Sequence, residues 1–116
     1  MNRYQPPKRH RFTAAERREV YAKTDGYCAY CGCELPASKM QVDHVFPVDL
    51  GDTDDMANLL PACRSCNNYK STLTLEKFRQ AVRHWPTVLM RDSVTFRNAV
   101  RFGMVKPTPH SVTFYF

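Results

Sequence analysis

Two pairs of cysteines with the same spacing constrain the fold of this chain more than any other feature. Cys28 and Cys31 form the first C-x-x-C pair, and Cys63 and Cys66 form the second. A C-x-x-C turn brings two thiolates onto one ion, and structural zinc prefers four such ligands in a tetrahedron. The two pairs therefore predict one structural zinc site. The 31 residues between the pairs are more than a simple zinc ribbon contains, so we expect this insert to hold structure of its own.

A fifth cysteine, Cys33, leaves an alternative open. The Cys31-x-Cys33 spacing suits a shared ion less well than C-x-x-C does, so we expect Cys33 to be a small, partly buried thiol outside the site. A site in which Cys33 replaces Cys31 is the alternative. In either case a site of four thiolates is closed, with no open coordination position. Any reaction must therefore use other residues.

The length of the chain and its apolar pattern narrow the class of protein. With 116 residues it has the size of one domain, and a domain this small gains much from a structural metal. It has no apolar run near 20 residues, so we expect no membrane span. The first residues lack the hydrophobic stretch of a secretory signal, so we expect a cytoplasmic protein. In that compartment five cysteines favour metal binding over disulfides.

The net charge of +6 is unevenly distributed. Residues 1–20 carry six Lys or Arg against two acidic residues, and residues 64–116 carry nine against two. Residues 21–63 have the opposite balance, two against seven. An acidic centre suits a bound cation, and basic flanks suit phosphates. The pattern favours an anionic partner such as a nucleic acid, although a solvated basic surface would carry the same charges.

Local signals place the first helices and strands. Residues 1–12 are basic and contain proline, which predicts an extended arm. Thr13 and Glu16 form a capping box that starts a helix over about 14–23. The later pattern predicts a strand over 39–46, a loop over 47–57 and a short return strand over 58–61.

The C-terminal half is predicted to be helical. A short helix follows the second cysteine pair. Thr74 caps a further helix, which has one apolar face and which Pro86 closes. Ser93 caps a third helix, stopped by Gly103. The segment 111–116 is either a strand or a docking tail.

A group of polar residues suited to chemistry lies between and just after the cysteine pairs. Asp43 and His44 are neighbours on the predicted strand, so their side chains point to opposite faces. One of them can hold a hard cation while the other meets a water molecule. Asn58 and Asn67 supply further polar side chains where the chain returns.

In this order and spacing, the cysteine pairs and the polar residues resemble the HNH endonuclease family, in its variant with Asn at the third motif position. The resemblance covers about residues 25–71, and its motifs interlock. The matching segments are Cys28-x-x-Cys31, Val42-Asp43-His44-Val45-Phe46-Pro47, Gly51-Asp52-Thr53-Asp54-Asp55, Asn58-Leu59-Leu60 and Cys63-Arg64-Ser65-Cys66-Asn67-Asn68-Tyr69-Lys70.

The resemblance implies an α+β fold with a small ββα-metal, treble-clef-like core that contains a structural zinc and is flanked by helices. The expected organisation has three parts. They are a basic N-terminal arm over 1–12, an HNH nuclease core with zinc knuckles over 13–71, and a C-terminal helical extension and tail of the same domain over 72–116.

The resemblance also implies roles for single residues. His44 is the general base that activates water, and Asn58 orients the His44 strand and the imidazole through hydrogen bonds. Asp43 and Asn67 hold one divalent ion, since a two-metal site would need more clustered carboxylates. Many members have His where this chain has Asn67; an amide oxygen is a harder ligand, which favours Mg²⁺ or Mn²⁺. The residues expected to contact nucleic-acid phosphates are Lys70 and Arg64.

The implied function is metal-dependent hydrolysis of DNA phosphodiester bonds, by nicking or by double-strand cutting. The alternative is a non-catalytic zinc module that binds nucleic acid or a protein, which has no need of Asp43, His44 and Asn67 together. Small HNH proteins similar to this one occur in bacterial viruses, mobile elements and restriction systems, and some viral ones work with DNA-packaging proteins. The resemblance therefore implies DNA as a partner, a larger DNA-processing or packaging complex as one setting, and the cytoplasm of a bacterial or phage-infected cell as the location.

Overall fold

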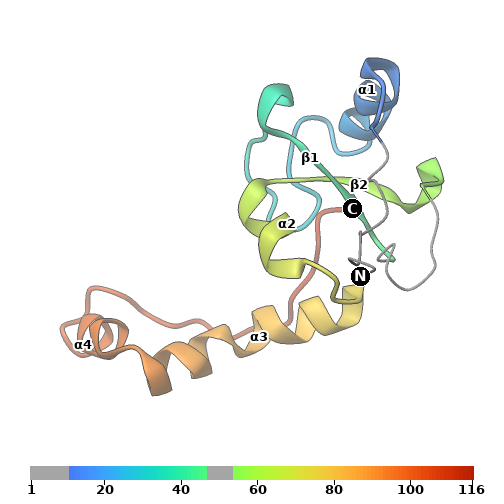
Figure 1. Ribbon diagram of the computed structural model, residues 1–116. Coiled ribbons are helices and arrows are strands. Elements are labelled where there is room, and N and C mark those ends of the chain that lie inside the picture. Colours follow the sequence, from blue (N-terminus) through green and yellow to red (C-terminus); the bar gives the residue numbers. More distant parts are fainter. Residues whose placement is uncertain (1–10, 47–53) are drawn as a thin grey trace, which may run out of the picture.

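The computed structural model describes residues 11–46 and 54–116, and its architecture is mixed α+β, as predicted. Two antiparallel strands lie in the upper part of Figure 1, with α1 packed on β2 and α2 packed on β1. The helices α3 and α4 follow, and the chain then runs back toward the strands (Figure 1). The elements are α1 (Ala14–Ala22), β1 (Gln41–His44), β2 (Leu59–Ala62), α2 (Arg64–Lys70), α3 (Leu75–Asp92) and α4 (Val94–Arg101).

The two strands form a short hairpin-like pair that carries the candidate site. Gln41 pairs with Ala62 at one end, and His44 pairs with Leu59 at the other. Both predicted strands are present. The first is shorter than expected, because a 3-10 turn over Ala37–Lys39 precedes β1, and the second has the expected length but begins one residue later, at Leu59. Residues 47–53, most of the predicted loop, lie outside the described residues.

The strand β2 separates two apolar clusters. Leu60 belongs to a cluster with the aromatic side chains of Tyr30, Phe78 and Phe114. Its neighbour Leu59 points the other way, into a smaller cluster built on α1 and the segment before β1. Because alternate residues of a strand face opposite sides, this arrangement buries every residue of β2.

The helix α1 begins as predicted and covers the outer face of β2. Thr13 and Glu16 make both hydrogen bonds of the capping box. Val20 is fully buried in the smaller cluster. Lys23, at the C-terminal end, donates a hydrogen bond of 2.8 Å to the Leu59 carbonyl. The helix is therefore tied to β2 by both packing and polar contacts.

The helix α3 corrects one prediction. Thr74 caps it as expected, but Pro86 lies inside the helix, which continues to Asp92. Proline removes one N–H donor, the group that would bond to the Val82 carbonyl, and leaves the rest of the ladder available. The part beyond Pro86 packs against α4, and this contact stabilises the turns that follow the proline.

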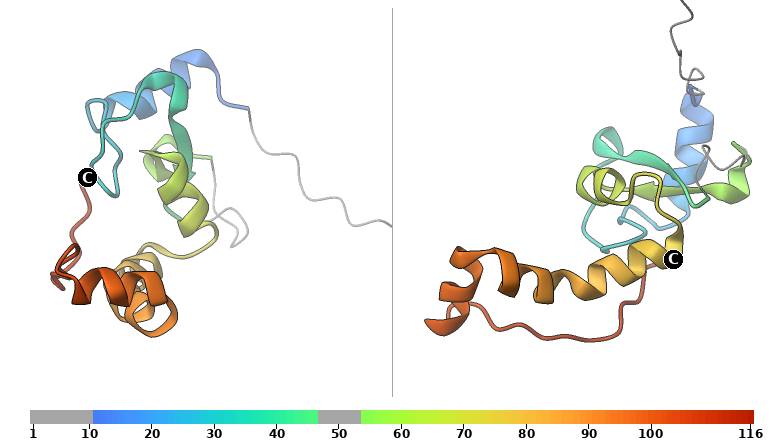
Figure 2. Two further views of the ribbon diagram at one scale, coloured as in Figure 1. Left: turned by 90° about the vertical axis from the view of Figure 1, so that its left-hand side faces the viewer. Right: turned by 60° about the horizontal axis from the view of Figure 1, so that its bottom comes forward.

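The C-terminal segment docks on the core. Ser93 caps α4, and the chain turns at Gly103, whose φ of 73° lies in the left-handed region. Figure 2 shows α4 apart from the strands, and the chain after α4 running back toward the rest of the molecule. The Tyr115 N–H donates to the Ala29 carbonyl at 2.7 Å. Of the two alternatives for 111–116, the structure has the docking tail.

Two further predictions concern the basic N-terminal arm and the absence of a membrane span. Most of the predicted basic arm, residues 1–10, lies outside the described ranges. Within those ranges, none of the helices has both the length and the apolar character that a membrane crossing requires.

Candidate metal centre and active site

The four cysteines of the two pairs converge on one point. Their Sγ atoms all lie within 4.8 Å of one another, although the pairs are far apart in the sequence. The predicted grouping is confirmed. The members of this cysteine cluster are Cys28, Cys31, Cys63 and Cys66.

Main-chain donors surround the sulfur atoms. The N–H groups of Tyr30 and Cys63 each lie 3.4 Å from the Sγ of Cys28. Cys63 is also the N-cap of α2, and its Sγ accepts from the Cys66 N–H at 3.4 Å. Such donors stabilise negative charge on sulfur, so the turns are shaped to hold thiolates.

The thiols are close enough to alter one another's ionisation. A hydrogen bond from the Cys66 thiol lowers the pKa of Cys28 to about 4. Burial opposes this shift, and a hydrogen bond from the Cys63 main chain supports it. The hydrogen bond between the two thiols, followed by burial, raises the pKa of Cys66. One thiolate therefore opposes the formation of the next. Four thiolates can share this space only around a cation, and Zn²⁺ favours such a set, so these residues fit a structural zinc.

Cys33 lies beside the cysteine cluster and is exposed, which corrects the expectation of a partly buried thiol. The chain reverses at Gly32, whose φ of 77° is in the left-handed region. The Cys28 N–H then donates to the Cys33 carbonyl at 2.9 Å. The turn thus engages the main chain of Cys33 and leaves its side chain at the surface.

Asp43 is buried next to the cysteine-bearing turn, with 4% of its surface exposed. Its Oδ2 accepts a hydrogen bond from the Tyr30 hydroxyl and lies 3.1 Å from the Lys70 ammonium. Burial, followed by the Asp43 charge, raises the pKa of Tyr30, so this phenol stays protonated and donates. Asp43 is therefore held in one orientation on β1.

Lys70 is fully buried at the end of α2. Besides the contact with Asp43, its Nζ donates to the His44 carbonyl at 2.8 Å. The predicted contact between Lys70 and a phosphate does not agree with this placement, because the ammonium points into the protein. Lys70 instead joins α2 to the two central residues of the candidate site.

His44 lies at the end of β1 with an acidic partner. Its Nε2 is 2.6 Å from Oδ1 of Asp54, which follows the undescribed part of the loop. The Phe12 ring lies against the imidazole, with 6.2 Å between ring centroids. These two contacts therefore help to define where the imidazole sits.

Asn58 holds the chain just beyond His44. Its Oδ1 accepts from the Phe46 N–H at 2.9 Å, and its Nδ2 donates to the Phe46 carbonyl at 3.0 Å. The Asn58 carbonyl also accepts from the Val45 N–H at 2.9 Å. These bonds fix the exit from β1.

The other predicted residues lie on α2. Asn67 precedes Lys70 by three positions, and residues three apart share a helix face. Because Lys70 reaches β1, half-buried Asn67 is on the face toward Asp43 and His44. Arg64 is exposed in the first turn of the same helix.

Sequence reasoning missed two residues of this site. Asp54 lies in an acidic segment of the predicted loop, and its partner His44 is ten residues away, so no local signal pairs the two side chains. Tyr30 lies between the first two cysteines and looked like part of the turn. Its phenol reaches Asp43 only because the turn packs against β1, so no local signal identified it.

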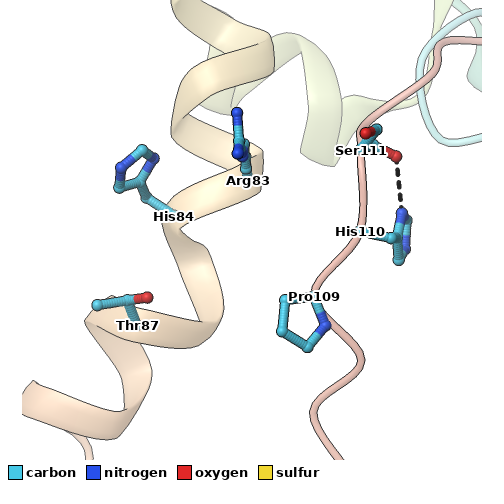
Figure 3. Close-up of a pocket in the computed structure, with 6 residues that line it drawn as sticks. All are labelled: Arg83, His84, Thr87, Pro109, His110 and Ser111. Carbon is cyan, nitrogen blue, oxygen red and sulfur yellow. Dashed lines mark hydrogen bonds between the residues drawn. The ribbon is translucent and has the colours of Figure 1, made fainter.

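A separate hollow of about 350 Å³ lies between α3 and the returning segment (Figure 3). None of the residues predicted for the site lines it. In Figure 3, His110 bonds to the Ser111 carbonyl across 2.8 Å. The candidate chemistry therefore lies on the strands and α2, and not in this hollow.

Comparison with known proteins identifies the part of the chain that holds the site. Residues 28–83 match the family model described as HNH endonuclease. We refer to residues 28–83 as the HNH segment. The HNH segment contains both cysteine pairs and every residue predicted for the catalytic site, and it ends within α3.

Two known proteins are similar to part of this chain. The CRISPR-associated endonuclease Cas9 of Corynebacterium diphtheriae is 27% identical over 85 residues, which covers 60% of this chain and 8% of that protein. The crystal structure of the Type II-C Cas9 enzyme from Actinomyces naeslundii aligns with a TM-score of 0.53 and 25% identity, over 63% of this chain and 8% of that one. The chain thus spans a small fraction of the length of the relatives it matches.

Proposed function

We propose that this protein is a metal-dependent HNH endonuclease that hydrolyses DNA phosphodiester bonds, with His44 as the general base. The proposal rests mainly on the groups that surround His44. Its imidazole is partly exposed at the end of a strand, with a carboxylate on one nitrogen and the Asp43 side chain on the adjacent residue. This arrangement lies inside the HNH segment.

The chemistry follows from what an imidazole can do near neutral pH. A phosphodiester is anionic and resists attack by neutral water. A neutral imidazole takes a proton from water as the oxygen attacks phosphorus. The bond between phosphorus and the 3′-oxygen then breaks. As the family resemblance implies, the products carry 5′-phosphate and 3′-hydroxyl ends.

Asp43 and Asn67 would hold the divalent ion, and their oxygen donors suit Mg²⁺ or Mn²⁺. Among the described contacts of Asp43, those with Tyr30 and Lys70 are both made by Oδ2. Neither residue therefore competes with a metal ion for Oδ1. When bound, such an ion supplies charge neutralisation at the scissile phosphate and at the departing oxygen. The residues themselves keep the carboxylate fixed: Tyr30 and Lys70 hold Asp43, and Asn58 holds the exit of the strand.

DNA as the substrate is supported by charge and by the relatives. The region from Arg64 onward carries nine basic residues against two acidic ones. Arg64 is exposed beside the cysteine cluster and is a candidate contact to the phosphate backbone. Contacts of that kind position a duplex without reading its sequence. Action within a larger DNA-processing or packaging complex is part of the same proposal.

The test is cleavage of supercoiled plasmid by the purified, zinc-loaded protein with Mg²⁺, with Mn²⁺ or with a chelator. We expect metal-dependent nicking or linearisation, and we expect His44→Ala to lower the rate by about 10²-fold or more. His84→Ala, at an exposed histidine on α3, is the matched control and should cut like the wild type.

Two other results would change the conclusion. Cleavage that persists in His44→Ala would assign the base to another residue or to a contaminant. A wild type that holds zinc and binds DNA but does not cut alone would favour a binding module or a requirement for a partner.

A further inference from the structure

The contact between His44 and Asp54 specifies which imidazole nitrogen carries the proton. An ionised carboxylate only accepts hydrogen bonds, so at 2.6 Å from Asp54 the Nε2 of His44 must be the protonated nitrogen. In a neutral imidazole the second nitrogen, Nδ1, then has the free lone pair. The geometry therefore singles out Nδ1 as the atom able to accept a proton.

The same contact limits the rotation of the ring. Phe12 lies against the imidazole, and Asp54 bonds its far nitrogen, so a flip of the ring would exchange Nε2 for a carbon atom and lose the bond. The main chain around His44 is also held, because Lys70 binds its carbonyl and the Asn58 carbonyl accepts from the next N–H. Backbone and ring are thus both restrained.

The contribution of this pair to stability should be small. The side chains of His44 and Asp54 are 21% and 41% exposed, and ion pairs at such positions stabilise proteins little. An acidic residue that contacts an imidazole without adding much stability is well placed for a different task, the selection of one tautomer.

We propose that Asp54 is a positioning residue that holds His44 in the Nε2–H tautomer, with Nδ1 turned toward the attacking water. This inference rests on the proposed role of His44 as the base. Asp54 does not touch the reacting atoms; it acts through the imidazole. Asp54 itself thereby becomes part of the active site.

The experiment compares Asp54→Asn with Asp55→Asn, the neighbouring exposed carboxylate, in zinc-loaded protein. The first readout is the ¹⁵N chemical shifts of the His44 ring, measured without DNA or other divalent ions. We expect Nε2–H in the wild type and in Asp55→Asn. In Asp54→Asn the amide can donate to Nε2, which should shift the population toward Nδ1–H.

The second readout is plasmid cleavage. We expect Asp54→Asn to lower kcat by about 10²-fold with KM nearly unchanged, because the wrong tautomer removes the base but not the binding surface. Asp55→Asn should cut like the wild type. Thermal unfolding of both variants should stay close to that of the wild type.

The two readouts separate the possible failures. Unchanged ring shifts and an unchanged kcat in Asp54→Asn would overturn the positioning role and leave the nuclease proposal intact. A shifted tautomer in Asp54→Asn, with no cleavage by the wild type under any condition, would overturn the nuclease proposal while supporting the tautomer assignment. A large drop in melting temperature with an unshifted tautomer would make Asp54 structural and overturn the inference.

Discussion

Lys70 shows how burial alters the role of a single charged residue. In the sequence it follows the second cysteine pair and has the appearance of a phosphate-binding lysine. In the fold its ammonium bonds the His44 carbonyl and pairs with Asp43, with none of the residue exposed. The direction of its side chain depends on how α2 packs on β1, and this packing joins residues more than twenty positions apart. A sequence motif can therefore identify Lys70 as a residue of the site, but it cannot show whether the side chain points to the surface or into the protein.

Replacement of Lys70 by methionine should destabilise the protein by about 3–5 kcal/mol, because it leaves the buried Asp43 carboxylate without its counterion. Urea unfolding of the zinc-loaded protein measures the change. Lys77→Met, at an exposed position of α3, is the control and should change stability by less than about 0.5 kcal/mol. Equal stability of the two variants would show that Asp43 is satisfied without Lys70.

At the scale of helices and strands, the sequence predicted where three helices begin, but it did not predict where α3 ends. Thr13, Thr74 and Ser93 each cap a helix through a bond to an N–H three residues away, so the whole signal lies within four residues. Pro86 was expected to end α3, and the helix passes through it. The turns beyond Pro86 are supported by α4, a contact that no window of sequence around the proline contains.

The side chains of the C-terminal tail help to hold it on the core, and Phe114 is the most buried of them. Phe114 is 9% exposed and packs edge-on against Tyr30 and stacked on Phe78, with ring centroids 5.2 and 5.5 Å away. The guanidinium of Arg79 lies over the Phe114 ring, 4.8 Å from its centroid. Phe114 thus closes the cluster beneath the cysteine-bearing turn.

Phe114→Ala should cost about 3–5 kcal/mol, since a buried aromatic ring is lost from a packed cluster. Phe102→Ala is the matched control: this ring is 81% exposed at the end of α4, and its loss should have little effect. Denaturant unfolding compares the two variants. Because Tyr30 also bonds Asp43, ¹⁵N-resolved spectra of the β1 amides would reveal whether the loss of Phe114 reaches the site. A stability loss as small as that of Phe102→Ala would mean that the tail is not part of the core.

At the scale of the whole molecule, the cysteine cluster lies where the two apolar clusters meet. Cys28 is part of the larger cluster, and Cys63 packs against both. Each cluster is small, and a chain of this length buries a limited share of its surface. In a bigger domain, a larger core holds the elements together. Here we expect the zinc site to join the turn of Cys28 and Cys31, β2 and α2 in one unit.

Removal of the zinc site should unfold the protein. Structural zinc supplies on the order of 10 kcal/mol in zinc-finger peptides, which is comparable to the whole stability of a typical domain, about 5–15 kcal/mol. We expect Cys63→Ser to lose about one equivalent of zinc and most of its cooperative unfolding transition. Atomic absorption and circular dichroism, with and without a strong chelator, measure both effects.

Cys33→Ser provides the matched control, because Cys33 is an exposed thiol beside the cysteine cluster and not one of its four members. It should keep full zinc content and the wild-type melting temperature. A comparison of Cys33→Ser with Cys31→Ser also decides the alternative that the sequence left open. If Cys33→Ser lost zinc while Cys31→Ser kept it, Cys33 would replace Cys31 as the ligand. If Cys63→Ser kept both zinc and its melting temperature, the two apolar clusters would hold the fold unaided, and the metal could not be the link between them.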